Sequence, residues 1–431
     1  MSEPRSSAVP VGVVTALVGF TSSFAVVLAG LRAVGADASQ ASSGLVALCV
    51  LQGVGTVWLS RRYRTPITLA WSTPGAALLV TSAVVSWRAA VGAFLVTGLL
   101  IAATGLWGAL GRLVAAIPVW LAHAMLAGIL LPLCLAPVLA AVDTPLYVLP
   151  IVVVWLVVQR YAPRWSAPAA FAVALVVAVV FAVESDLLAW PDVPGMQLTA
   201  PAFEVGAVVG VALPLYVVTM ASQNVPGAAV LATAGYTAPW RPTMLLTGLG
   251  TALGAPAGAH AINLAAITAA LPASPDADPD PAQRWRASQA AGWTYVVLAP
   301  LAPALIALVD AGPYGLVESV AGLALLTTFA ASLHAAMSSA ADRVAAALAL
   351  LLAASGLSIA GVGSAFWALV VGLVVHAVLR PREAAAATLA AQDAHARDDG
   401  AVTGGDVDGE APDDDILGRT RGGPAGPMSD G

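Results

Sequence analysis

The chain has 431 residues, of which 59% are hydrophobic and only 10% are charged. Because a soluble domain carries charge on about a quarter of its residues, this composition excludes an ordinary soluble protein and indicates a chain that crosses a membrane many times. The formal net charge is -6 and no residue is a lysine, so no basic patch suggests a nucleic-acid partner.

The chain opens with a short polar stretch, Met1–Pro10, which we expect to be a cytoplasmic N-terminus rather than a cleaved signal. An apolar run long enough to span a bilayer comes next, and further apolar runs follow one another as far as Arg380. They predict an all-α polytopic protein with about fourteen transmembrane segments. In chain order the predicted segments are Val11–Leu31, Ser42–Ser60, Pro66–Val85, Ala89–Leu110, Leu113–Leu133, Leu146–Val158, Pro168–Val183, Val205–Asn224, Arg241–Gly254, Pro256–Leu271, Ala290–Val309, Gly315–Leu333, Val344–Ala360 and Gly363–Leu379.

Arginine placement predicts how these segments are oriented. Arginines follow the second, sixth, eighth, tenth, twelfth and last segments, whereas the acidic stretch Glu184–Asp192 and Asp310 follow odd-numbered segments. By the positive-inside rule both termini are then cytoplasmic, with Arg88 as the exception. We therefore expect Glu184–Asp192 to face the outside.

The predicted segments divide into two sets of seven. An odd number of spans in each half makes the two halves insert in opposite directions, as in the inverted repeats of many transporters. We predict repeat one over residues 11–183 and repeat two over residues 204–380, within a transmembrane domain of residues 11–380. The remainder, Pro381–Gly431, is rich in Ala, Gly and Asp and is predicted to be a disordered acidic cytoplasmic tail.

The third and tenth segments are interrupted by proline and glycine, at Pro74-Gly75-Ala76 and at Pro256-Ala257-Gly258. Non-helical backbone at membrane depth is tolerated only where it is buried in protein or lines a cavity, so such breaks point to a transporter's binding site. We predict that each segment is half-extended and half-helical. The third would be capped by Ser72 or Thr73 and the tenth would be helical from about His260, with both helix N-termini near the midplane. Two unrelated proline kinks are the alternative.

Polar side chains occupy the first and eighth segments, which are equivalent under the predicted repeat. Bonding between helices is the alternative to ligand contact for the hydroxyl groups, but the amides of Gln223 and Asn224 favour a binding site because buried amides need partners. The lack of Asp and Glu well inside these segments favours an anionic ligand at helix N-termini. Trp71, Phe24 and Tyr216 could hold an aromatic ring or simply pack.

Other chemistry is not indicated by the sequence. The histidines lie on separate segments without metal-ligand spacing, and no phosphate-binding loop is present. No Ser/His/Asp grouping suggests a hydrolase. We therefore expect no metal, no cofactor and no enzymatic activity.

At these stretches the sequence resembles the benzoate/proton symporter (BenE) family. The resemblance covers essentially Val11–Arg380 and rests on TPITLAWSTPGAAL, SQNVPG and GAHAINLAAITAA, from the third, eighth and tenth segments. The family is similar to the uracil/xanthine and sulfate-type carriers. That similarity implies a core domain of segments one to four and eight to eleven, which moves against a gate domain formed by the other segments. Where the uracil carriers place glutamates, this chain offers Gln223, Asn224, His260 and Asn263, which argues against a nucleobase.

The combined interpretation is an inner-membrane secondary transporter that imports benzoate or a related aromatic carboxylate with protons, by alternating access. The expected partners are that substrate, protons and the lipid bilayer, and a homodimer is one option for the assembly. The alternatives are a sulfate, dicarboxylate or nucleobase carrier on the same scaffold, an uncoupled anion channel and, remotely, an intramembrane enzyme. The predicted substrate-binding residues are Thr21, Ser22, Phe24, Thr73, Gly75, Tyr216, Gln223, Asn224, Ala259, His260 and Asn263.

His260 is the predicted proton-coupling residue. The four site-forming segments lack a buried carboxylate, and histidine is the side chain that ordinarily titrates near neutral pH. A bound carboxylate and a proton on His260 would each strengthen the binding of the other. Glu204, Glu318 and protonation of the substrate itself are the alternatives, and a neutral histidine hydrogen-bonded at a helix break is the purely structural interpretation.

Overall fold

The computed structural model describes residues 8–82, 86–186, 195–266, 268–359 and 362–379. The chain divides into two compact units, Met1–Val378 and Leu379–Gly431. The predicted tail Pro381–Gly431 lies outside the described residues, as do most of the predicted N-terminal stretch, the end of the third segment and most of Glu184–Asp192.

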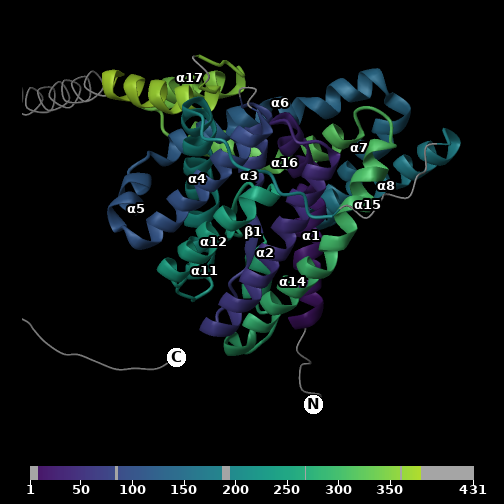
Figure 1. The fold of residues 1–431 in the computed structure, drawn as a ribbon, viewed down its shortest axis with the longest axis horizontal. Coiled ribbons are helices and arrows are strands. Elements are labelled where there is room, and N and C mark those ends of the chain that lie inside the picture. The colour runs from purple at the N-terminus through teal and green to yellow at the C-terminus, as the bar shows by residue number, and fades with distance from the viewer. Residues whose placement is uncertain (1–7, 83–85, 187–194, 267, 360–361, 380–431) are drawn as a thin grey trace, which may run out of the picture. The chain divides into compact units, whose positions relative to one another are not determined.

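In the first half of the chain, the regular elements of the described residues are helices and one short strand (Figure 1). Its elements are α1 (Ala8–Ala33), α2 (Ala38–Tyr63), β1 (Leu69–Trp71), α3 (Thr73–Val80), α4 (Trp87–Leu106), α5 (Gly108–Ala115), α6 (Val119–Asp143), α7 (Pro145–Tyr161), a single 3₁₀ turn (Pro163–Trp165) and α8 (Ser166–Glu184).

The second half repeats this order with more interruptions. Its elements are α9 (Val205–Ala207), α10 (Leu213–Thr219), α11 (Val225–Thr233), α12 (Trp240–Gly254), β2 (Ile262–Leu264), α13 (Ala270–Ala273), α14 (Trp285–Leu298), α15 (Ala302–Asp310), α16 (Leu316–Ala336), α17 (Arg343–Ala354) and a last helix, Ser364–Leu379. The π-helical turns Val208–Ala212 and Met220–Asn224 join α9, α10 and α11 into one run. Three 3₁₀ turns, Ala255–Ala257, Pro281–Gln283 and Ala299–Leu301, complete the half.

Each predicted membrane segment overlaps one or more of these elements, and eight helical runs of the described residues are long and apolar enough to cross a membrane. The predicted bounds of the fifth segment, Leu113–Leu133, are wrong. Helix α6 begins at Val119 and continues to Asp143, with two prolines inside it. Such prolines are tolerated in membrane helices because neighbouring groups satisfy the freed carbonyls. The eighth segment likewise passes its proline and continues to Thr233 instead of ending near Asn224.

Helix α2 shows how the local sequence sets an element boundary. Asp37 caps this helix: its Oδ1 accepts a 2.9 Å hydrogen bond from the Gln40 N–H, and the Gln40 side chain accepts one from the Asp37 N–H. This is the capping box, which satisfies two otherwise unpaired donors of the first turn. Hydrogen bonds from the Ser39 hydroxyl and the Gln40 N–H hold the pKa of the Asp37 carboxyl below its ordinary value.

Strands β1 and β2 form a two-stranded antiparallel sheet in which Leu69 pairs with Leu264 and Trp71 pairs with Ile262. Helix α2 contacts β1 and helix α12 contacts β2. Two further backbone bonds extend the pairing, from the Ser72 N–H to the Ala261 carbonyl and from the Ala265 N–H to the Thr68 carbonyl. The extended halves of the third and tenth segments are therefore joined in the interior of the protein.

The prediction that the tenth segment becomes helical at about His260 is wrong. Residues 262–264 are strand, and the helical part of the segment is the short α13, which begins at Ala270. The run of Ala, Ile and Leu favours a helix by propensity alone, but pairing with β1 satisfies the backbone groups of this stretch as a strand. Tertiary pairing overrides propensity here, so His260 and Asn263 do not lie at a helix N-terminus.

The packing of the two halves is symmetric. Helices α2 and α14, from the second and eleventh segments, pack together, as do α12 and α4, from the ninth and fourth. In the first pair a Cβ atom on Gly53 would lie 2.6 Å from the Gly292 carbonyl oxygen, and in the second pair one on Gly248 would lie 2.6 Å from the Gly98 carbonyl oxygen. Small residues allow this close backbone approach between membrane helices.

Threonines bind the outer edges of the two strands in the same symmetric way. The Thr56 hydroxyl oxygen in α2 accepts a 2.9 Å hydrogen bond from the Leu69 N–H of β1. The Thr251 hydroxyl oxygen in α12 accepts a 2.9 Å hydrogen bond from the Ile262 N–H of β2. Both features occur at equivalent positions in the two sets of seven segments, as a repeat requires.

Candidate functional site

A cavity of about 450 Å³ lies between the core domain (α1–α4 and α9–α15 with both strands) and the gate domain (α6–α8, α16, α17 and Ser364–Leu379). The core domain lines it with residues such as Ser22, Trp71, Thr73, Gln223 and Tyr295. The gate domain lines it with residues such as Trp155, Gln159, Arg164 and Thr328. Its volume lies within the range of small-molecule sites, and no Asp or Glu is among its lining residues.

Thr73 stands at the cavity because the strand β1 ends and α3 begins there. Ser72 is the cap of this helix: its Oγ accepts a 3.1 Å hydrogen bond from the Gly75 N–H and is hydrogen-bonded to the Thr219 hydroxyl at 2.9 Å. Pro74 in the first turn has no N–H to satisfy. The capping role is thus filled by Ser72, which leaves the Thr73 side chain at the positive end of the α3 dipole.

Three polar side chains from different core segments meet at this cavity, namely Thr73, Gln223 and Tyr295. Within the part of the chain that the structure describes, none of their side-chain polar atoms has a hydrogen-bond partner, and none is enclosed away from the cavity. Buried polar groups are normally paired. Their arrangement therefore leaves three hydrogen-bonding groups available to a ligand.

Gly19 is the reason that the Tyr295 hydroxyl reaches the cavity. A Cβ atom on Gly19 would lie 2.2 Å from the Tyr295 hydroxyl oxygen, so any larger residue at this position in α1 would displace the phenol. Tyr295 is otherwise only 1% exposed. The ring is held by Trp71, whose indole lies edge-on to it with centroids 6.4 Å apart.

Aromatic rings continue from this cavity along α1. Phe20 contacts Trp71 at a centroid distance of 5.7 Å and Phe24 at 5.4 Å, and Phe24 meets Phe171 of α8 edge-on at 5.6 Å. The row joins the core domain to the gate domain. An aromatic ligand in the cavity would meet the end of this row at Trp71, in the edge-to-face or offset contacts that aromatic rings prefer.

The other predicted ligands in α1 and α3 have their polar groups bonded within the protein. The Thr21 hydroxyl donates to the Leu17 carbonyl at 2.7 Å. Ser22 lines the cavity and its hydroxyl donates to the Gly19 carbonyl at 3.3 Å. The Gly75 N–H is taken by the Ser72 cap, and Phe24 belongs to the contact with the gate domain.

The predicted ligands of the eighth and tenth segments are mostly structural in their contacts. Asn224 is fully buried and its Oδ1 accepts a 2.9 Å hydrogen bond from the Leu264 N–H, so it holds the edge of β2. The Asn263 amide donates to the Leu264 carbonyl at 2.7 Å. The Ala259 N–H donates to the Gly254 carbonyl, and the Tyr216 hydroxyl is bonded to Thr104 at 2.6 Å. None of these four lines the cavity.

His260 is fully buried behind the cavity. Its Nε2 donates to the Ser72 carbonyl at 2.9 Å, and its ring lies edge-on to Phe94 with centroids 6.3 Å apart. Its Nδ1 has no hydrogen-bond partner among the described residues. The imidazole therefore binds the backbone of Ser72, the residue before Thr73, and it does not line the cavity itself.

Tyr295 was not among the sequence-predicted ligands, and neither were the gate residues Gln159, Arg164 and Thr328. A single tyrosine in an apolar helix looks like ordinary packing. Its role becomes visible only when Gly19 is seen opposite it. In the sequence, Arg164 indicates only which side of the membrane its loop faces. Its position at the cavity depends on how the gate domain is placed.

Two apolar spaces that are equivalent under the repeat differ in size. One is lined by Phe24, Phe171 and Val320 of segments one, seven and twelve, and has a volume of only about 10 Å³. Its counterpart, lined by Tyr216, Phe366 and Met125 of segments eight, fourteen and five, has a volume of about 310 Å³. The core domain is thus packed tightly against the gate domain on one side and loosely on the other.

Comparison with known proteins gives consistent results. Residues 2–378 match the family model described as "Benzoate membrane transport protein". The chain is 40% identical over 371 residues to the inner membrane protein YdcO of Escherichia coli (strain K12), covering 85% of this chain and 94% of that protein. It is 30% identical over 342 residues to the benzoate membrane transport protein of Acinetobacter baylyi, covering 78% of this chain and 86% of that protein.

Solved structures show the same fold at low sequence identity. The transmembrane domain of the cyanobacterial bicarbonate transporter BicA aligns with a TM-score of 0.53 at 13% identity, covering 85% of this chain and 97% of that one. The murine anion transporter Slc26a9, in a structure described as inward-facing, aligns with a TM-score of 0.55 at 13% identity, covering 88% and 68%. These likenesses confirm the predicted fold, an inverted repeat of seven and seven segments.

Proposed function

The chain belongs to the benzoate membrane transport protein (BenE) family, and from that premise we propose that it carries benzoate or a related aromatic carboxylate across the inner membrane together with protons. Membrane transport itself follows from the family and the fold. The aromatic substrate and the proton coupling are what the proposal adds.

The observation that carries the proposal is the convergence of Thr73, Gln223 and Tyr295 on one cavity, each without a hydrogen-bond partner among the described residues. A carboxylate only accepts hydrogen bonds when it is ionised. The Thr73 and Tyr295 hydroxyls and the Gln223 amide can all donate, and the N-terminal end of α3 adds a positive dipole. With no acidic residue in the lining, nothing repels the anion.

The aromatic ring of the substrate has a matching surface. Trp71 and Tyr295 line the core side of the cavity, and Trp155 lies on the gate side. Sulfate and small dicarboxylates would leave this apolar surface exposed to water, at a cost proportional to the area left uncovered. The cavity therefore favours an anion that carries an apolar ring over a compact one.

The position of the cavity supports alternating access. The cavity reaches the exposed Pro163–Arg164 turn, which the arginine pattern assigns to the cytoplasm. On the other side of the same interface, Phe24 and Phe171 close against each other. We assign this arrangement to the inward-facing state, in which substrate leaves to the cytoplasm and both termini are cytoplasmic.

Proton coupling is proposed at His260. Because the Ser72 carbonyl can only accept, Nε2 carries the hydrogen in this arrangement, and a second proton on Nδ1 would meet no acceptor among the described residues. The imidazole is accordingly neutral here, as expected after a symporter has released its proton. A proton added at Nδ1 would leave the Nε2–H bond to the Ser72 carbonyl in place and strengthen it, because a charged donor forms the stronger hydrogen bond. Ser72 also caps α3, so protonation would act on the start of that helix.

The test is uptake of labelled benzoate into proteoliposomes that contain the purified protein, with and without a pH gradient that is acidic outside. We expect accumulation above the equilibrium level only with the gradient, and competition by unlabelled benzoate but not by excess sulfate or uracil. Flux that only equalises the two sides would indicate an anion channel. Competition by sulfate or uracil would indicate the alternative carriers.

A further inference from the structure

A groove of about 650 Å³ lies between the C-terminal part of α2 and the middle of α14, apart from the cavity described above. We propose that this groove binds an anionic phospholipid, with the lipid phosphate on the arginines and an acyl chain along the apolar side chains. The lining residues are Val54, Val57, Trp58, Arg61, Arg62, Arg64 and Trp293.

The lining residues of α2 form one stripe along the helix. Val54, Val57, Trp58, Arg61 and Arg62 each have neighbours three or four residues away within the set, which places them on one helix face. At a rise of about 1.5 Å per residue, the stripe extends roughly 12 Å from its apolar end to its basic end. It therefore changes from apolar to cationic along its length, as a phospholipid changes from acyl chain to phosphate.

The apolar part of the groove contains two tryptophans whose side chains are largely exposed. Trp58 is 49% exposed on α2 and Trp293 is 56% exposed on α14. Tryptophans on membrane helices gather at the boundary between hydrocarbon and headgroups. The two indoles thus place this part of the groove at the depth where the acyl chains of a lipid begin.

The basic end has no acidic partner within the described residues. The described residues form two ion pairs, Arg32 with Asp310 and His376 with Asp342. Neither pair includes a residue of the groove. The closest acidic residues in sequence to α14 are used locally, since Asp280 caps the following 3₁₀ turn and Asp278 accepts the Asp280 N–H. Basic sites at the cytoplasmic end of membrane helices attract anionic headgroups.

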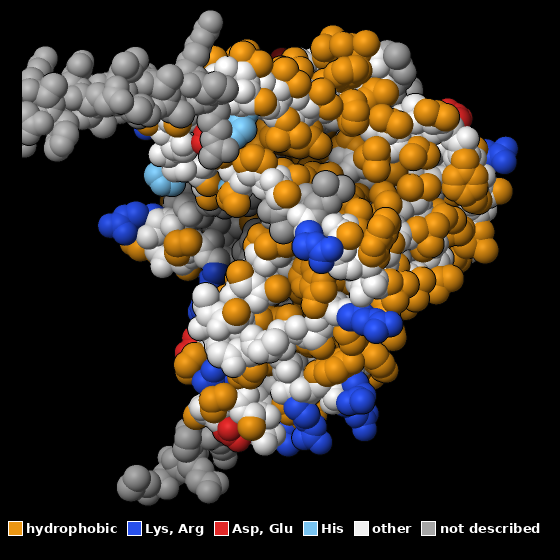
Figure 2. All heavy atoms as spheres, turned by 90° about the vertical axis from the view of Figure 1, so that its left-hand side faces the viewer, with side chains coloured by type: hydrophobic (Ala, Val, Ile, Leu, Met, Phe, Trp, Pro, Cys, Tyr) orange, Lys and Arg blue, Asp and Glu red, His pale blue; other side chains and the backbone are white. Residues whose placement is uncertain are grey.

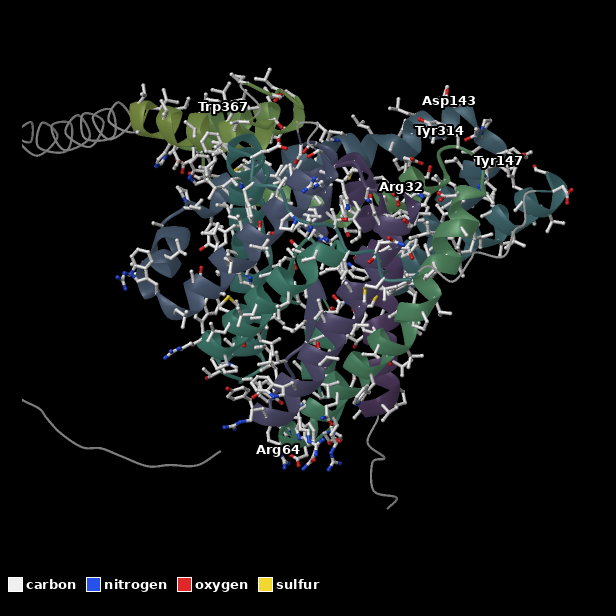
Figure 3. The ribbon with its side chains drawn as sticks, viewed as in Figure 1. Arg32, Arg64, Asp143, Tyr147, Tyr314 and Trp367 are labelled. Atoms are coloured by element: carbon white, nitrogen blue, oxygen red, sulfur yellow. The ribbon has the colours of Figure 1, made fainter. Side chains whose placement is uncertain are left out.

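Aromatic stacking holds the arginines at this end of the molecule. Arg62 lies over the Tyr63 ring with its guanidinium carbon 5.4 Å from the centroid, and Arg64 lies over Trp285 at 5.0 Å. Arg64 lies at the lower end of the helices in Figure 3, and Figure 2 shows basic side chains gathered toward the lower part of a largely hydrophobic face. The cationic charge is thereby fixed beside apolar surface, where both ends of a lipid can be bound together.

The experiment compares lipid binding to the full-length protein and to the variant Arg61→Gln/Arg62→Gln/Arg64→Gln. Native mass spectrometry would count bound phosphatidylglycerol and phosphatidylcholine, and a thermal-shift assay would follow stabilisation by each. We expect phosphatidylglycerol to bind and stabilise the parent protein, with affinity about fivefold weaker for each arginine removed. The matched control Arg112→Gln/Arg160→Gln/Arg241→Gln removes the same charge elsewhere and should behave as the parent.

A second measurement does not depend on the arginine variant folding. Phosphatidylglycerol with brominated acyl chains should quench tryptophan fluorescence of the parent more than that of Trp58→Phe/Trp293→Phe. Equal quenching in both would overturn the proposal, as would equal stabilisation by phosphatidylcholine. If inorganic phosphate stabilises as well as the lipid, the groove is a general anion site. If the arginine variant changes only the oligomeric state, it is an interface between copies.

Discussion

The Nε2 atom of His260 lies 2.9 Å from the main-chain carbonyl oxygen of Ser72, the residue whose side chain caps α3. The imidazole is thus connected to the start of the helix that the substrate is proposed to meet, although it does not face the cavity itself.

Replacing His260 by glutamine should abolish pH-driven accumulation while leaving exchange of substrate across the membrane. Glutamine can still donate to the Ser72 carbonyl, but it does not titrate near neutral pH. The measurement is benzoate accumulation driven by a pH gradient, with counterflow exchange as the second readout. His123→Gln, on the gate helix α6, is the control and should accumulate normally. Full accumulation by His260→Gln would assign the coupling to another group.

Tyr295→Phe should weaken benzoate binding at least about tenfold, because a hydrogen bond to a charged group contributes about 1.5–3 kcal/mol. Gly19→Ala should weaken it as well, since the added Cβ atom would lie 2.2 Å from the Tyr295 hydroxyl oxygen. Binding affinity is measured on the purified proteins. In the double variant the second change should add little, because both act on one hydroxyl; fully additive losses would contradict the proposed role.

Ser72→Ala should affect the stability of the protein, whereas Thr73→Val should affect its affinity for benzoate. The first removes the cap of α3 and leaves the Thr219 hydroxyl without its partner, so it should lower the free energy of unfolding by about 1 kcal/mol. The second keeps the cap and removes a donor from the cavity, so it should lower affinity and leave stability unchanged. Thermal unfolding and benzoate binding of both variants check this. A destabilised Thr73→Val with normal affinity would make Thr73 structural.

Thr56→Val and Thr251→Val should destabilise the protein by similar amounts. Each change keeps the side-chain shape but leaves a buried strand N–H, of Leu69 or Ile262, without an acceptor, at a cost of about 1–3 kcal/mol. The control Thr247→Val loses only a hydroxyl that donates within its own helix, to the Thr243 carbonyl. Unfolding in detergent compares the three. A large effect at one strand alone would argue against the symmetry of the repeats.

Orientation in the membrane can be tested at two exposed serines. With both termini cytoplasmic, a cysteine at Ser185, after α8, should react with an impermeant thiol reagent in intact cells. A cysteine at Ser338, after α16, should react only once the membrane is opened. The native cysteines are buried or half-buried, which keeps the background low. The reverse pattern would invert the proposed topology.

The sequence predicted the scaffold better than the site. The apolar runs were enough to predict the membrane segments, and the proline-glycine breaks were enough to predict the extended start of the third segment. Both kinds of feature depend on local composition. The strand at Ile262–Leu264 could not be predicted locally, since its partner β1 lies in the other repeat. Asn224 and Gln223 look alike in sequence, yet one amide binds the edge of β2 and the other faces the cavity. Only the packing distinguishes them.

The pairing of β1 with β2 also constrains biosynthesis. At about 5–20 residues per second, the ribosome needs on the order of ten seconds or more after Trp71 before it reaches Ile262. During that interval the β1 backbone groups that pair with β2 have no partner, and hydrocarbon offers no substitute. We therefore expect the third segment to be incompletely inserted, or covered by another protein, until the second repeat is synthesised. Chains truncated before Ile262 should accordingly be degraded faster in cells than chains truncated after Ala273, a difference that pulse-chase labelling would measure.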